Sequence, residues 1–165
     1  MDQFGNNELH ETRREEDMSN ITTSIEVNVP VKTAYNQWTQ FEEFPRFMKG
    51  VKEVRQLDDK RLHWKAEIGG REKEWDAEII AQMPDQRIAW KTIGGAINQG
   101  SVTFEPLSEK KSKVNLHIAY EPEGLIDNVG DELGAVELRV KEDLERFKTF
   151  IENRGEETGA WRGKV

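Results

Sequence analysis

The strongest constraint in this sequence is a long helical periodicity near its C-terminal end, over residues 128–153. Apolar residues recur there at every third or fourth position: Val129, Leu133, Val136, Val140, Leu144, Phe147 and Ile151. Most positions between them are charged, and a helix over this range would be about 39 Å long. Because such a helix gains most of its stability from a surface that covers its apolar stripe, the rest of the chain is expected to supply that surface.

The middle of the chain, residues 51–120, alternates between apolar and polar residues, which predicts β-strands. Turn signals at Gly69-Gly70, Pro84-Asp85 and Gly94-Gly95 help to divide it into about six strands. A further alternating stretch, Thr22–Val29, precedes it. Strands joined by short turns are antiparallel, and one polar face indicates a sheet with one side in solvent. The sequence therefore predicts a two-layer α+β domain in which the long helix covers the apolar face of the sheet.

Two short helices are expected between the first strand and the remaining strands. Pro30 suits the first turn of a helix over Val31–Thr39, and a second helical turn follows around Pro45. This second turn is rich in aromatic residues that are expected to be core and could also wall a cavity. Residues 1–20 and 154–165 are polar and are expected to be disordered tails, so that residues 21–153 form one domain. Trp161 has little reason to lie in such a tail unless it docks on the domain.

Composition narrows the classes of function. The net charge of −8 argues against nucleic acid as a partner, because such binding relies on Lys and Arg neutralising phosphates. The absence of cysteine rules out disulfides and thiolate chemistry and suits a cytoplasmic location. The N-terminal region lacks the pattern of a signal peptide, and no apolar run approaches the roughly 20 residues that span a bilayer. A cytoplasmic protein without an integral membrane segment is therefore expected.

The order of elements resembles the START-related helix-grip superfamily, above all its polyketide cyclase/dehydrase-like and coenzyme-Q-binding-like members. The segments that carry the resemblance are SIEVNVPVKTAYNQWTQFEEFPRFM, IAWKTIGG, NQGSVTFEPL and VNLHIAYEPEG, together with Trp64 and Trp75. The resemblance implies a curved antiparallel sheet of about seven strands wrapped around one long C-terminal helix. It also implies an apolar cavity between sheet and helix that takes a hydrophobic small molecule, either a lipid, a quinone or a polyketide-like compound.

Three tryptophans are the most informative candidates for such a ligand site. Trp64, Trp75 and Trp90 have inward parity on three consecutive strands, where they form either packed core or a ligand-facing wall. Small residues at inward parity, Ala77 and Ala81 among them, leave room beside the indoles. The other candidate ligand-binding residues come from the sheet, the second helical turn and the long helix: Thr92, Phe41, Phe44, Val129, Leu133, Val136 and Val140.

No catalytic set and no metal site stands out in the sequence. His63 and His117 share the parity of charged neighbours and are expected to face solvent. No histidine or cysteine spacing suits a metal, so neither a metal nor another cofactor is expected. The inward positions are nearly all apolar, with Thr92 the chief exception. This pattern favours a carrier or sensor over an enzyme, since a proton-transfer group must reach its substrate.

Two alternatives remain open. The first is a polyketide cyclase/dehydratase-type enzyme in which Arg71, Lys73, Tyr35 or Tyr120 supplies the polar group. Arg71 and Lys73 share the parity of Trp75, which would direct them toward the mouth of the cavity. The second alternative is a protein-interaction module that uses the two tails.

Overall fold

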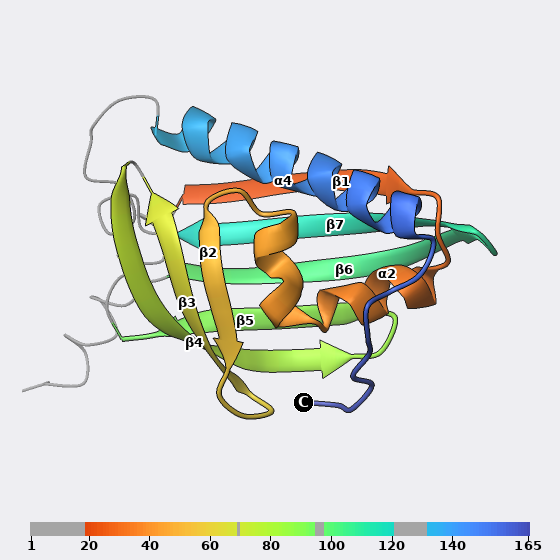
Figure 1. The fold of residues 1–165 in the computed structure, drawn as a ribbon, viewed down its shortest axis with the longest axis horizontal. Coiled ribbons are helices and arrows are strands. Elements are labelled where there is room, and N and C mark those ends of the chain that lie inside the picture. The colour runs from red at the N-terminus through yellow and green to blue at the C-terminus, as the bar shows by residue number, and fades with distance from the viewer. Residues whose placement is uncertain (1–18, 69, 95–97, 121–131) are drawn as a thin grey trace, which may run out of the picture.

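The computed structural model describes residues 19–68, 70–94, 98–120 and 132–165 (Figure 1). Seven strands form one antiparallel sheet in the order β1-β7-β6-β5-β4-β3-β2. The strands are β1 (Ser19–Val27), β2 (Val51–Gln56), β3 (Arg61–Ile68), β4 (Arg71–Met83), β5 (Arg87–Ile93), β6 (Asn98–Ser108) and β7 (Lys111–Tyr120). The sheet curls around the long helix α4 (Glu132–Arg154), as Figure 1 shows. The predicted α+β architecture is therefore confirmed.

Two short helices lie between β1 and β2, as the sequence predicted. The α-helix α2 (Val31–Trp38) follows Pro30, and the 3-10 helix η1 (Phe41–Arg46) contains Pro45. Aromatic packing holds them against the sheet and α4: the ring centroid of Trp38 lies 5.3 Å from that of Phe44 and 5.4 Å from that of Phe147. These tilted and edge-to-face contacts are the arrangement that aromatic pairs prefer.

The apolar stripe of α4 is buried along its described part. Val140 is 8% exposed, Leu144 2%, and both Phe147 and Ile151 are fully buried. Val136, one turn earlier, is partly buried against the same core. The first predicted residues of this helix, 128–131, lie outside the described residues.

A bulge in β4 changes which of its side chains point inward. The pairing register with β5 shifts between Ile79 and Ala81, so Ile80 is the extra residue and is 46% exposed. Gln82, opposite the buried Ile88, then takes the inward position and is 1% exposed. The prediction that Ala81 points inward is therefore wrong, because a bulge inserts one residue and reverses the alternation beyond it.

The segment after α4 follows a defined path across α2, whereas the sequence indicated a disordered tail for residues 154–165 (Figure 1). Gln37 and Thr158 exchange two hydrogen bonds, of 3.1 Å from Gln37 Nε2 to Thr158 Oγ1 and 2.9 Å from Thr158 N to Gln37 Oε1. The backbone N–H of Trp161 donates to Thr39 Oγ1 over 3.0 Å. Gln37 and Thr39 are buried polar residues, which require such partners. The polar composition of the C-terminal segment gave no sign that it would pair with buried polar side chains of another element.

Candidate functional site

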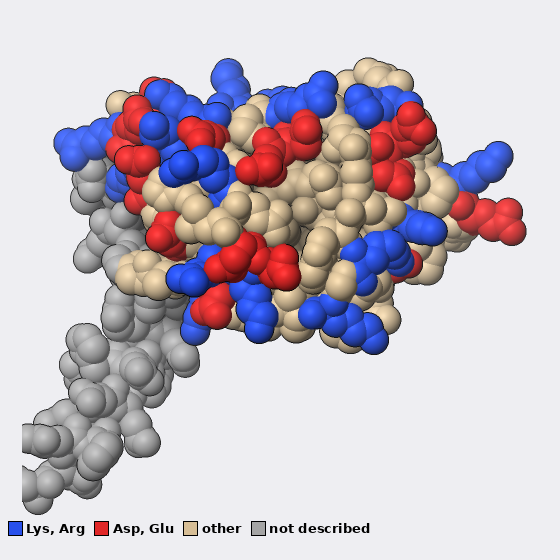
Figure 2. All heavy atoms as spheres, turned by 60° about the horizontal axis from the view of Figure 1, so that its bottom comes forward, with Lys and Arg blue, Asp and Glu red and all other residues tan. Residues whose placement is uncertain are grey.

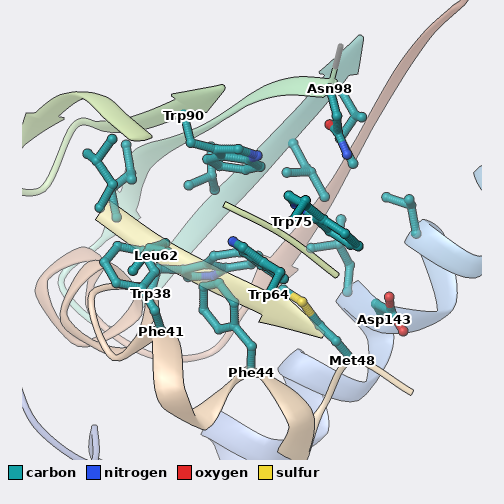
Figure 3. A pocket seen from close by; sticks show the side chains of 17 residues that line it. Trp38, Phe41, Phe44, Met48, Leu62, Trp64, Trp75, Trp90, Asn98 and Asp143 are labelled. Carbon is teal, nitrogen blue, oxygen red and sulfur yellow. The ribbon is translucent and has the colours of Figure 1, made fainter. Parts of the chain in front are cut away.

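An apolar cavity of about 130 Å³ lies between the sheet, the two short helices and α4 (Figure 3). Strands β3 to β7 supply its walls, and α2, η1 and α4 close its other sides. Its lining is dominated by aromatic and aliphatic side chains, of which Figure 3 labels Trp38, Phe41, Phe44, Met48, Leu62, Trp64, Trp75 and Trp90, together with the polar Asn98 and Asp143. A concave, mainly apolar site with few polar groups is the usual form of a small-molecule site.

Two of the tryptophans form a stacked pair on neighbouring strands. Trp64 in β3 and Trp75 in β4 are directly opposite in register, and their rings are 5.9 Å apart with an angle of 5° between their planes. Cross-strand neighbours point to the same face of a sheet, so the two indoles make one continuous aromatic wall. The edge of this wall faces Phe44, whose ring centroid lies 5.6 Å from that of Trp64.

The third tryptophan of the wall depends on a glycine that sequence reasoning did not single out. Trp90 in β5 lies opposite Gly100 in β6. A Cβ atom at Gly100 would come within 2.7 Å of Trp90 Cε2, closer than real Cβ atoms approach another atom. Gly100 therefore lets the indole lie over the neighbouring strand. The available signal was a glycine inside a strand pattern, which often marks a close approach.

The structure brings together six of the residues expected to bind a ligand: Trp64, Trp75, Trp90, Phe41, Phe44 and Val140 all line the cavity. Thr92 and Val136 are not among its lining residues. The Thr92 hydroxyl instead accepts a hydrogen bond of 3.1 Å from the backbone N–H of Asn98. Val129 and the side chain of Leu133 lie outside the described residues.

The four residues considered for catalysis do not line the cavity either. Tyr35 is fully buried and Tyr120 is 1% exposed, each in the packed core. Arg71 is exposed and Lys73 partly exposed near the start of β4. Arg71 and Lys73 share the parity of Trp75 but do not line the cavity. On β4 the lining begins further along the strand, at Trp75.

Two polar residues that sequence reasoning missed do reach the cavity. Asn98 begins β6, and Asp143 lies on α4 beside the apolar stripe. Asp143 accepts hydrogen bonds from the backbone N–H of Lys49, over 3.3 Å, and from the Arg146 guanidinium. Burial raises the pKa of the Asp143 carboxyl, and the bond from Arg146 partly opposes that rise. The position of Asp143 three residues after Val140 was the only sequence signal, since it places the side chain at the edge of the buried stripe.

The outer face of the sheet carries the histidine that the sequence placed toward solvent. His63 Nδ1 lies 2.7 Å from Asp76 Oδ1, and His63 Nε2 lies 3.2 Å from Glu74 Oε1. The hydrogen bond with Asp76, followed by that with Glu74, raises the pKa of His63. Among the described residues, no cluster of three or more His, Asp or Glu side chains is arranged to hold a metal.

The face seen in Figure 2 shows no large patch of only positive or only negative side chains. There, Lys and Arg side chains are interspersed with Asp and Glu over the coloured part of the molecule. None of the helices in the described ranges is both long enough and apolar enough to cross a bilayer.

A curved antiparallel sheet around a C-terminal helix, with an apolar cavity between them, defines the START-like class. Residues 27–149 match the family described as polyketide cyclase/dehydrase and lipid transport, and the chain belongs to this family. An uncharacterised 17.2 kDa protein of Streptomyces lincolnensis is 54% identical over 149 residues, which cover 90% of this chain and 99% of that protein.

Solved structures share the same fold. A Deinococcus radiodurans protein is 26% identical with a TM-score of 0.66, and the match covers 82% of this chain and 99% of that one. The Zhui aromatase/cyclase of a Streptomyces species is 13% identical with a TM-score of 0.71, over 87% of this chain and 99% of that one. A START superfamily protein of Mycobacterium smegmatis is 16% identical with a TM-score of 0.65, over 82% and 95% of the two chains.

Proposed function

We propose that this protein binds a hydrophobic small molecule in the cavity between the sheet and α4. The observation that carries the proposal is an aromatic-walled cavity of about 130 Å³ inside a START-like fold. A ligand that buries about 200 Å² of apolar surface would gain roughly 5 kcal/mol before the cost of its ordering. Such a gain supports measurable binding with few polar contacts.

The size of the cavity limits the ligand that enters without rearrangement. Its volume of about 130 Å³ is close to that of engineered cavities of about 150 Å³ that bind benzene. Sites for drug-sized molecules are larger, from about 300 Å³ upward. The cavity therefore suits a single ring, whereas a long lipid or a polyketide chain would require lining side chains to move.

A substitution that fills the cavity tests this proposal. Ile118 lines the cavity, whereas the adjacent His117 is exposed. Ile118→Trp should abolish binding of toluene measured by calorimetry, while His117→Trp adds the same ring to the outside and should leave binding unchanged. Equal affinity in the two variants would place the ligand elsewhere, and no binding by the folded wild-type protein would contradict the proposal.

A second candidate function is proton transfer to or from the bound molecule. Asp143 favours it, because this carboxyl lines an apolar cavity and burial raises its pKa. A carboxyl group whose pKa is raised toward neutrality can act as a general acid or base. This arrangement supports loss of water from a small β-hydroxy ketone. The ionised Asp143 carboxylate would take the proton from the α-carbon, the α–β double bond would form as the β-carbon–oxygen bond breaks, and the carboxyl would return the proton to the departing hydroxide, which leaves as water.

Turnover and binding must be measured separately to test this second candidate. Removing a general acid or base lowers the rate by about 10²- to 10⁴-fold. Asp143→Asn should therefore lose water elimination from a small β-hydroxy ketone while its dissociation constant for the corresponding saturated ketone stays within about twofold of the wild-type value. A wild-type rate no faster than that in buffer would exclude this reaction.

A further inference from the structure

Two tryptophans that line the cavity carry buried polar atoms without partners. The indole N–H groups of Trp38 and Trp64 are fully covered, and neither has a hydrogen-bond acceptor among the described residues. Trp38 is only 2% exposed. Buried donors in native proteins are almost always paired, so each unpaired N–H in a cavity requires an explanation.

The two indole rings that carry these donors both border Phe44. The ring of Phe44 packs against both indoles, at 5.3 Å from Trp38 and 5.6 Å from Trp64 between ring centroids. Figure 3 shows the nitrogen of Trp64 facing the space enclosed by the labelled side chains. Two elements, α2 and β3, therefore each bring an indole with an unpaired N–H to the part of the cavity beside Phe44.

Packing alone does not account for the indole nitrogens. Phenylalanine already provides much of this aromatic cluster, for example at Phe41 and Phe44, without introducing a polar atom. Trp75 and Trp90 also line the cavity, but neither of their indole nitrogens is a fully buried atom without a hydrogen-bond partner. Among the tryptophans that line the cavity, the fully buried donors without a partner are thus those of Trp38 and Trp64.

The charge of the acceptor follows from the other polar groups of the cavity. Asp143 carries the one carboxyl group among the described lining residues. Burial raises the pKa of this carboxyl, so the site disfavours a negative charge. A carboxylate or a phosphate would lose its hydration on entering the apolar cavity, and the Arg146 guanidinium is already bonded to Asp143. The donors therefore suit a neutral acceptor such as a carbonyl oxygen.

We propose that the ligand is a single-ring, uncharged carbonyl compound whose oxygen accepts hydrogen bonds from the indole N–H groups of Trp38 and Trp64. This inference rests on the proposed function and adds the chemical class of the ligand and the residues that select it. The ring fills the apolar cavity of about 130 Å³, and the carbonyl satisfies two donors that an unsubstituted hydrocarbon would leave unpaired.

A pair of nearly isosteric ligands isolates this hydrogen bond. Acetophenone has a carbonyl oxygen where α-methylstyrene has a methylene group, and calorimetry gives the ratio of their dissociation constants for each variant. Comparing this ratio between variants removes the difference in solubility of the two ligands, because that difference is common to all measurements.

The variants remove the donors one at a time. Trp64→Phe and Trp38→Phe should each shift the ratio against acetophenone by about three- to tenfold, the range expected for one net hydrogen bond. Trp161→Phe is the matched control, because it makes the same Trp-to-Phe change at a residue that does not line the cavity, and it should leave the ratio within about twofold. The indole N–H resonance of Trp64 should also shift on addition of acetophenone and remain in place with α-methylstyrene.

The outcomes separate this inference from the proposed function. An unchanged ratio in both donor variants, with binding retained, would overturn the role of the indoles and leave ligand binding intact. Absence of binding by either compound to the wild-type protein would overturn both. Should Trp38→Phe fail to fold, the Trp64→Phe ratio and the resonance of Trp64 decide the matter.

Discussion

The space between the sheet and α4 has a packed end and a hollow end. At the packed end, Phe47, Phe147 and Ile151 are all at most 1% exposed, and the rings of Phe47 and Phe147 lie 5.2 Å apart. At the hollow end, the same helix and sheet enclose the cavity beside Trp64 and Asp143. The two ends share one architecture, and they differ in whether side chains fill the space.

The polar groups follow the same division. The hollow end holds the unpaired indole N–H of Trp64 and the Asp143 carboxyl, whereas the packed end is formed mainly by apolar side chains. Trp38 borders both ends, since it lines the cavity and its ring lies 5.4 Å from that of Phe147. Unsatisfied polar atoms destabilise a folded protein, so a chain that retains them beside a cavity does not optimise that region for stability alone. The comparison teaches that one layer interface can be a packed core at one end and leave an apolar cavity at the other.

The largest expected effect breaks the packed end. Phe147→Ala removes a fully buried ring and should lower the free energy of unfolding by about 3–5 kcal/mol, since the transfer and cavity terms add. Urea denaturation measures this loss. The exposed Glu145→Ala on the same helix should change stability by no more than about 0.5 kcal/mol. A comparable loss for both variants would contradict the assigned face of α4.

A smaller loss of stability is expected at the hollow end, where the Trp90 indole lies close against the backbone of Gly100. Gly100→Ala places a Cβ against the Trp90 indole and should destabilise the protein by about 1–3 kcal/mol as the ring is displaced. Displacement of Trp90 should also weaken toluene binding. Ser101→Ala, one residue along the strand, is the control and should preserve affinity. Unchanged stability and affinity in Gly100→Ala would show that the cavity wall tolerates the shift.

The contact of the C-terminal segment with α2 gives a third test, at a site next to the packed end. Thr39→Val keeps the shape of the side chain but removes the acceptor of the Trp161 N–H, and should cost about 1 kcal/mol or slightly more. Proteolysis after residue 155 should become faster. Thr149→Val on the exposed side of α4 should show neither change. Equal proteolysis rates in wild type and Thr39→Val would indicate that this bond does not hold the segment.

The smallest expected change in stability concerns His63 on the outer face of the sheet, away from both the packed and the hollow end. Asp76 and Glu74 raise the pKa of His63, so the charged imidazole stabilises the folded state. This stabilisation is fully present below the unfolded pKa of about 6.5 and is lost as pH rises through the raised folded value. The melting temperature of the wild-type protein should therefore fall slightly relative to that of His63→Asn between about pH 6 and pH 9. Parallel pH profiles for the two proteins would show that the pair contributes nothing.

Much of the fold could be predicted from the sequence because its periodicities are local. A repeat of three to four residues predicted α4, and alternation predicted the strands and the inward parity of Trp64, Trp75 and Trp90. Each of these patterns depends only on which face of its own element a side chain takes. The C-terminal segment escaped such reasoning, because its partners on α2 lie about 120 residues earlier in the chain.

The candidate site was decided by the tertiary structure. Periodicity places Asp143 at the edge of the apolar stripe of α4, and only the tertiary structure shows that this edge borders the cavity. Ala81 has inward parity in the sequence, and the bulge at Ile80 turns it away. The local pattern determines where a side chain points, whereas segments distant in the sequence determine whether the space in front of it is filled. A cavity is such an unfilled space, and no single element encodes it.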